Sequence, residues 1–196
     1  MNIQCFDDKD AFPYLIIDEL YNQEELNLLM NDFDKIKFKD SEDDRTFSAK
    51  NEKGKVLKRA RATMVYPHNF TDANILKKVF MEKCFLNHSH WFYQNLKFQN
   101  INVLLSYYEN QDYYKRHYDT ALITCLTWFH KVPKKFSGGD FKFSDYNISI
   151  ECKSNRMIVF PSMIFHEVDE IKMKEEDCNQ GYGRYCFSHF LLTYGL

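Results

Sequence analysis

The stretch YYENQDYYKRHYD, residues 107–119, ends in His117, Tyr118 and Asp119. On a β-strand, side chains two residues apart point to the same face of the sheet. The His117 imidazole and the Asp119 carboxylate can therefore aim at a common point. Both groups are metal ligands, but two ligands hold a divalent ion poorly. The stretch thus predicts a β-rich fold with a third ligand further along the chain.

The best candidate for that third ligand is His166, which follows the strand-like run in RMIVFPSMIFHEV, residues 156–168. Two histidines and one carboxylate form a facial triad, which leaves coordination positions open and suits non-haem Fe(II). Further along, Arg184 opens another apolar run, and its guanidinium could pair with a dicarboxylate through two hydrogen bonds. Considered one at a time, His117 could be an ordinary surface residue and Arg184 an ordinary surface charge. Their order together with His166 favours a metal site.

The full set of motifs resembles the Fe(II)- and 2-oxoglutarate-dependent dioxygenases, in particular the prolyl 4-hydroxylases and the oxygen-sensing prolyl hydroxylases. The motifs are His117-x-Asp119, Gly138-Gly139-Asp140-Phe141, His166-Glu167-Val168 and Arg184-Tyr185, and the similarity covers about half of the chain, from residue 101 onward. The resemblance implies that His117, Asp119 and His166 bind Fe(II). It further implies that 2-oxoglutarate chelates the iron and pairs with Arg184, that O₂ takes the last position, and that ascorbate supports turnover.

The same resemblance implies further residues of the cosubstrate site. Tyr107, ten residues before the first histidine, would reach the cosubstrate or substrate, with ordinary core packing as the alternative. Relatives often place a Tyr that hydrogen-bonds the distal carboxylate where this chain has Trp128. Its indole N–H could donate one bond, or the hydroxyl of Thr124 or Thr127 could serve instead. Cys186 stands where a small or hydroxylated residue is usual.

The composition of the 196-residue chain fits a single domain with a sizeable core. Its net charge of −2 creates no global field for nucleic acid or an anionic membrane. The six cysteines include no C-x-x-C pair, and the N-terminus lacks the basic and then apolar pattern of a signal peptide. We therefore expect reduced thiols and a cytoplasmic protein. No apolar run approaches the ~18 residues of a membrane helix.

From residue 98 onward, short apolar runs alternate with turns. Several short strands at this spacing favour a sandwich or barrel, and a double-stranded β-helix, or jelly roll, fits their count. We expect a mainly β dioxygenase domain over residues 1–196, with its core in 98–196. Residues 1–97 would form an N-terminal support region, whose helices pack on one outer face.

Within this support region, residues 12–18 read as a strand, and Asn22 can cap the helix that follows. A second helix should begin at Thr71 or Asp72 and run to about Gln94, with a break near residues 87–90. His88 and His90 lack a partner at metal-ligand spacing, so we expect them at this helix junction rather than in a metal site.

A local basic cluster lies within a charged segment that reads as a loop or long hairpin. Its members are Lys53, Lys55, Lys58, Arg59 and Arg61. We expect these side chains to form a solvated face. Contact with an acidic peptide or a phosphate backbone is the alternative.

The sequence thus predicts a hydroxylase that acts on a prolyl residue of a peptide or protein, or on a free amino acid, and that converts 2-oxoglutarate to succinate. A nucleic-acid demethylase on the same scaffold is one alternative, although that branch typically carries a second Arg shortly after the first, and Arg184 has none. A non-catalytic jelly-roll binding module is another. We expect neither a membrane nor a nucleic acid as partner.

Overall fold

The structure is a computed structural model, which describes residues 1–38, 49–78 and 87–193. Two antiparallel sheets dominate it. In spatial order, the larger sheet contains β1 (Asn2–Phe6), β2 (Tyr14–Asp18), β11 (Arg156–Pro161), β7 (Ile123–Phe129), β14 (Arg184–Leu192), β5 (Asn100–Tyr108) and β4 (Arg61–Met64). The smaller sheet contains β10 (Ile148–Ile150), β9 (Phe141–Phe143), β12 (His166–Val168), β6 (Tyr113–His117) and β3 (Lys58–Arg59). A separate pair joins β13 (Lys172–Met173) to β8 (Phe136–Ser137).

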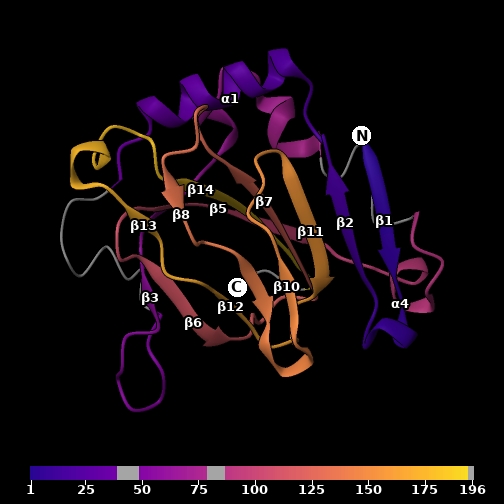
Figure 1. Ribbon diagram of the computed structural model, residues 1–196. Coiled ribbons are helices and arrows are strands. Elements are labelled where there is room, and N and C mark those ends of the chain that lie inside the picture. Colours follow the sequence, from indigo (N-terminus) through magenta and orange to yellow (C-terminus); the bar gives the residue numbers. More distant parts are fainter. Residues whose placement is uncertain (39–48, 79–86, 194–196) are drawn as a thin grey trace.

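The two sheets face each other (Figure 1), and an aromatic core lies between them. Trp128 and Phe160 of the larger sheet pack against Phe141 of the smaller one, and all three side chains are fully buried. The expected mainly β, jelly-roll architecture is confirmed. The strands predicted from apolar runs are present, and β1, β3, β8 and β13 are additional short strands that the sequence analysis did not identify.

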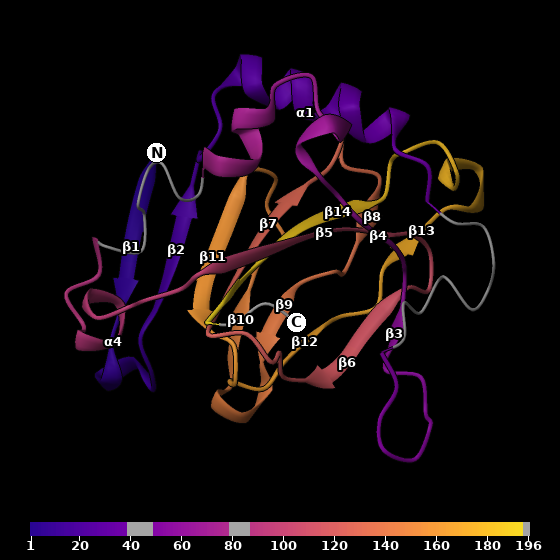
Figure 2. The same cartoon turned by 180° about the vertical axis from the view of Figure 1, so that it is seen from behind.

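A second core lies on the outer face of the larger sheet, under the helix α1 (Gln23–Lys35). Asn22 and Glu25 form the predicted capping box, which satisfies backbone N–H groups at the start of the helix. Phe33 contacts the rings of Phe129 and Tyr185 on the sheet. Figure 2 shows the same helix across this face from behind. The expected helical cover on one outer face is confirmed.

The other helices within the described residues are short. They are the 3₁₀ turns Asp8–Asp10, Pro67–Asn69, Ala73–Lys77, Ser144–Tyr146 and Glu175–Asp177, and the helix α4 (Trp91–Gln94). Asp72 caps the turn at residue 73, as predicted, and residues 79–86 of the expected second helix lie outside the described residues. The expected break is present, because His88 bonds the carbonyl of Phe6 and His90 caps α4.

The basic cluster does not form one solvated face. Lys53 and Lys55 are exposed on a hairpin, in agreement with the prediction. Arg61 instead pairs with Glu109, and Lys58 is only 4% exposed. The prediction is wrong for these two residues because β3 and β4 bring them into the sheets.

The cysteines of the described residues are free, namely Cys5, Cys125, Cys152, Cys178 and Cys186. Cys84 lies outside the described residues. Among the described residues, none of the helices combines the length and the apolar character needed to cross a membrane.

Candidate metal centre

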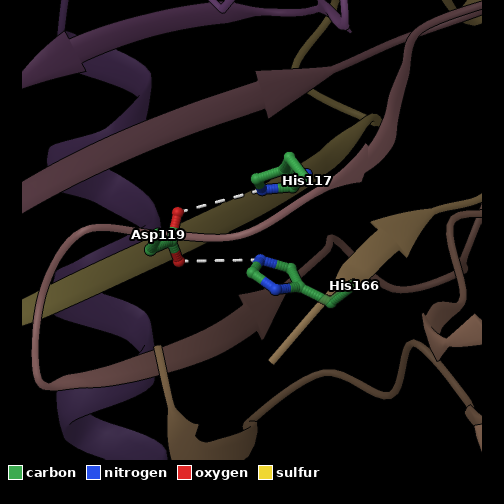
Figure 3. Close-up of side chains that lie close together, drawn as sticks. All are labelled: His117, Asp119 and His166. Carbon is green, nitrogen blue, oxygen red and sulfur yellow. Dashed lines mark ion pairs between the residues drawn. The ribbon is translucent and has the colours of Figure 1, made fainter. Parts of the chain in front are cut away.

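Three predicted ligands converge between the sheets (Figure 3). His117 is the last residue of β6 and His166 the first of β12, and the two are paired directly across these antiparallel strands. Asp119 follows β6 in a loop, where its backbone N–H donates to the carbonyl of Ser162 at 2.9 Å. Residues about fifty positions apart in the chain thus meet because β6 and β12 are neighbours in one sheet.

The ligand atoms are close enough to share one ion. Asp119 Oδ1 lies 3.8 Å from His117 Nε2, and Asp119 Oδ2 lies 3.6 Å from His166 Nε2. All three ligand groups fall within 4.8 Å of one another. An imidazole nitrogen binds a metal at about 2 Å, so one ion between these atoms needs only a small contraction of the site. The donor set of two imidazoles and one carboxylate fits Fe(II).

Hydrogen bonds fix the direction of both imidazoles. His117 Nδ1 is 2.8 Å from the Lys115 carbonyl, and His166 Nδ1 is 2.9 Å from the Ile164 carbonyl. Because a carbonyl only accepts, each Nδ1 carries the proton, and each Nε2 offers a lone pair toward Asp119. Burial lowers the pKa of His117 to about 2, and it also lowers the pKa of His166 although Asp119 opposes this. Both rings are therefore neutral, as metal ligation requires.

A cavity opens beside the three ligands. Its wall is formed by both sheets and consists of Lys58, Leu104, Ser106, Tyr108, Tyr114, His117, Asp119, Leu126, His166, Val168, Cys186, Ser188 and Phe190. The rings of Tyr114 and His117 are stacked with their centroids 3.4 Å apart. A bulge in β6 allows these two residues, three apart in sequence, to face the same cavity.

Arg184 lies next to this cavity and is completely buried. Its guanidinium carbon is 5.0 Å from the Tyr108 ring and 5.5 Å from the Trp128 ring. Within the described residues, none of its three nitrogens has a hydrogen-bond partner, and neither does Trp128 Nε1. Burial lowers the pKa of Arg184, but the nearby acidic groups Cys152 and Cys186 outweigh this and raise it. These buried donors therefore lack an anion, and a carboxylate of 2-oxoglutarate fits them.

The model of the 2OG-Fe(II) oxygenase superfamily matches residues 103–191, which contain all three ligands and Arg184. The protein is a 2-oxoglutarate-dependent, non-haem iron dioxygenase, and its cofactors are Fe(II) and 2-oxoglutarate. A comparison with curated protein sequences gave no match.

Solved structures of prolyl hydroxylases share the fold of this oxygenase. A prolyl-4-hydroxylase from Pseudomonas putida is 15% identical with a TM-score of 0.63, and the match covers 93% of each chain. A viral collagen prolyl hydroxylase from Paramecium Bursaria Chlorella virus-1, in its 2OG complex, is 16% identical with a TM-score of 0.60, over 90% of this chain and 94% of the other. A Trichoplax adhaerens prolyl hydroxylase, in complex with a hypoxia inducible factor peptide fragment, is 11% identical with a TM-score of 0.62, over 92% and 83%.

The structure places Thr124 of the oxygenase beside the carboxylate ligand rather than beside Arg184. Its hydroxyl donates to Asp119 Oδ2 at 2.7 Å and lies 2.8 Å from the Ser162 hydroxyl. Thr124 thus orients Asp119, in place of the cosubstrate contact expected from the sequence. Thr127 lies on the opposite face of β7 and does not reach the cavity.

Tyr107 does not reach the cavity either. Its hydroxyl donates to Glu109 at 2.8 Å and accepts from the Gly183 backbone N–H at 3.0 Å, in the outer core. The adjacent Tyr108 lines the cavity instead, because neighbouring residues on β5 face opposite sides of the sheet. Counting residues back from the first histidine could not distinguish the two tyrosines.

The sequence analysis also missed Lys58 and Ser106 as residues of the cavity. A signal for Lys58 was present. Lys58, Ala60 and Ala62 alternate with Arg59 and Arg61, and a period of two places the lysine on the same face as the two small apolar residues. All three are buried, whereas the two arginines are partly exposed.

Proposed function

We propose that the oxygenase hydroxylates a prolyl residue of a peptide or protein, with Fe(II) held by His117, Asp119 and His166. The observation that carries the proposal is the convergence of these three ligands beside a buried guanidinium without an anionic partner. When bound, the iron supplies the oxidative chemistry together with 2-oxoglutarate and O₂. The decarboxylation of 2-oxoglutarate yields succinate and CO₂.

Different residues of the site bind the iron, bind the cosubstrate and exclude water. The neutral imidazoles of His117 and His166 offer Nε2 to the iron, and Thr124 holds the Asp119 carboxylate toward it. Arg184 and the Trp128 indole N–H bind the distal carboxylate of 2-oxoglutarate, which gives the buried donors a partner. The apolar side chains Leu104, Leu126 and Val168 exclude water from the cavity.

A groove on the outer side of His117 is evidence that the substrate is a polypeptide. It is lined by Lys50, Asn51, Glu52, Lys53, Leu57, Arg116, His117, Tyr118 and Phe165. Tyr118 is 54% exposed there, and the Arg116 guanidinium lies 3.6 Å from the centre of the Phe165 ring. Exposed aromatic surface next to a metal ligand suits a peptide that presents a ring to the iron. The peptide complex of the Trichoplax prolyl hydroxylase agrees with such a substrate.

The proposal is tested with purified protein, Fe(II), ascorbate, 2-oxoglutarate and a set of proline-containing peptides. We expect succinate to form together with a peptide that has gained one oxygen atom, as seen by mass spectrometry. The matched control is the same peptide with its proline replaced by alanine, which should gain no oxygen. The variant His166→Ala should form neither product.

Two other results would contradict different parts of the proposed function. Oxygen gained by a free amino acid but by no peptide would contradict the polypeptide substrate and leave a hydroxylase of small molecules. Succinate formed without any hydroxylated peptide or amino acid would contradict the proposed hydroxylation as a whole.

A further inference from the structure

A second cation, Lys58, faces the same cavity as the three metal ligands. Its strand β3 is the edge of the smaller sheet and pairs with β6, which carries His117. The side chain crosses from there toward β5 of the larger sheet, where Nζ donates to the Ser106 hydroxyl at 2.8 Å. Lys58 thus bridges the two sheets inside the fold, although it belongs to the N-terminal half of the chain.

The ammonium of Lys58 lacks an anionic partner. Its hydrogen bond to Ser106 uses one of three N–H donors, and within the described residues no carboxylate lies within ion-pair distance of it. The rings of Tyr114 and Tyr108 lie 5.2 Å and 5.8 Å from Nζ. Burial lowers the pKa of Lys58 to about 8, although Cys186 and Asp119 act against this. A buried ammonium without a counter-ion is costly, and a bound anion would offset that cost.

The strand register places Lys58 close to Arg184. Ser106, which holds the ammonium, is paired with Cys186 across β5 and β14. The next inward-facing pair along these strands is Tyr108 with Arg184. Two residues along a strand span about 7 Å, so one carboxylate between the two pairs can accept hydrogen bonds from both cations. The Arg184 charge also lowers the pKa of Lys58, as expected for neighbouring cations.

We propose that Lys58 is a cosubstrate-binding residue, whose ammonium shares the distal carboxylate of 2-oxoglutarate with Arg184. The opposite, chelating end of the cosubstrate belongs at the iron, beside His117 and Asp119. The inference rests on the iron site of the proposed function, but it is independent of the substrate that is hydroxylated. It assigns part of the cosubstrate site to a strand outside residues 103–191.

The experiment compares two oxo-acids by calorimetric titration into anaerobic, Fe(II)-loaded protein. One is 2-oxoglutarate, and the other is 2-oxopentanoate, which has the same carbon chain with a methyl group in place of the distal carboxylate. For Lys58→Met we expect the affinity for 2-oxoglutarate to fall about 10- to 100-fold, as for a lost hydrogen bond to a charged group. The affinity for 2-oxopentanoate should stay within about twofold. The matched control is Lys55→Met, which removes an exposed lysine three residues before Lys58 and should change neither affinity.

Folding is checked separately, by the urea midpoint of the metal-free proteins. Lys58→Met should be at least as stable as the parent, because methionine has a similar length and carries no charge to bury. Lys58→Arg keeps the charge and should retain selectivity for 2-oxoglutarate over 2-oxopentanoate. These two results show that the loss in Lys58→Met arises from the missing charge.

The proposal is overturned if Lys58→Met binds 2-oxoglutarate as tightly as the parent, or if it loses affinity for both oxo-acids equally. A parent protein that binds neither oxo-acid would overturn it together with the iron site. A parent that binds 2-oxoglutarate but hydroxylates no peptide contradicts only the proposed function.

Discussion

A single hydroxyl on β7 supports the metal centre. Thr124 donates to Asp119 Oδ2 and so fixes one carboxylate oxygen in the loop that follows β6. We predict that Thr124→Val weakens Fe(II) binding by about 10- to 100-fold, as is typical when a partner of a metal ligand is lost. The dissociation constant is measured anaerobically by competition with a chromophoric chelator. Thr124→Ser keeps the hydroxyl and should bind iron almost as the parent does.

Thr127 provides the matched control on the same strand. Its hydroxyl is buried without a hydrogen-bond partner among the described residues, on the face away from the cavity. Thr127→Val should therefore leave iron affinity unchanged and slightly stabilise the fold, because it removes an unsatisfied polar group. If both valine variants weakened iron binding equally, the effect would come from packing of β7 rather than from the bond to Asp119.

His189 governs part of the pH dependence of stability. It is completely buried on β14, where burial lowers its pKa to about 4. An unfolded histidine titrates near 6.5, so the unfolded chain takes up a proton first as the pH falls. The stabilisation from neutral His189 is full above pH 6.5 and is lost between pH 6.5 and 4. We predict that His189→Gln reduces the fall in unfolding free energy over this interval by up to about 3 kcal/mol.

The measurement for His189 is a series of urea unfolding curves across pH 4 to 7. The exposed His68 provides a control variant, His68→Gln, which removes a histidine from the surface instead of from the core. An unchanged slope in His189→Gln would show that other buried groups, such as His117 and His166, account for the whole effect.

At the residue scale, the sequence predicted the metal ligands but not their neighbours. His117 and Asp119 are two residues apart, and His166 follows a strand-like run further along the chain, so sequence alone displays all three, and the structure brings them together. The partners of these ligands depend on contacts between distant strands. Ser162, for example, meets Asp119 and Thr124 only after β7 and β11 have paired. Tyr107 was chosen over Tyr108 because residue counting cannot fix the face of a strand.

At the scale of elements, the turn before β9 makes room for the Arg184 side chain. Gly139 has a φ of +76°, and a Cβ there would lie 2.4 Å from Ile171 Cδ1 and 3.0 Å from Arg184 Cδ. We predict that Gly139→Ala destabilises the protein by about 1–3 kcal/mol more than Gly54→Ala, because only the first substitution overpacks its site. Gly54 has a similar φ of +74°, but no atom lies within 4 Å of its added Cβ. Urea unfolding of both variants measures the difference.

The same pair of variants separates stability from cosubstrate binding. Gly139→Ala should also weaken the affinity for 2-oxoglutarate, because the added methyl group would crowd the aliphatic part of the Arg184 side chain. Gly54→Ala should leave this affinity unchanged. Equal destabilisation of the two variants would show that backbone strain alone matters at both turns. Gly138 and Gly139 belong to one of the motifs that the sequence shares with the dioxygenases, and both have a positive φ. The turn is present, and its lack of side chains has this second consequence for the site.

The elements themselves were more predictable than their boundaries and partners. Apolar runs indicated the strands β5, β7, β11 and β14, because each of these strands is at least six residues long and mostly apolar. Two-residue strands such as β3 have too little sequence to show a period. Lys58 was consequently assigned to a solvated loop, whereas β3 directs it into the cavity. The bulge in β6 is equally invisible in the sequence, since it depends on the register with β12.

At the scale of the whole molecule, the N-terminal half completes both sheets. β2 lies between β1 and β11 in the larger sheet, β4 pairs with β5, and β3 closes the smaller sheet beside β6. The outer core likewise joins Leu15 and Phe33 to Phe187. Residues 1–97 therefore contribute strands to both sheets, in addition to the helix that covers the outer face of the larger sheet. We propose that residues 1–196 fold as one cooperative unit.

This proposal predicts the behaviour of a fragment. Residues 98–196 alone would expose the edges of β5, β6 and β11 and the apolar outer face of the larger sheet. We predict that this fragment shows no cooperative urea transition by circular dichroism and binds no iron, whereas the full chain does both. The fragment would also lack Lys58, so its cosubstrate site would be incomplete even if the strands formed. A cooperative transition together with iron binding in the fragment would instead make the N-terminal half a separable addition, because the two sheets would then be stable without β2, β3 and β4.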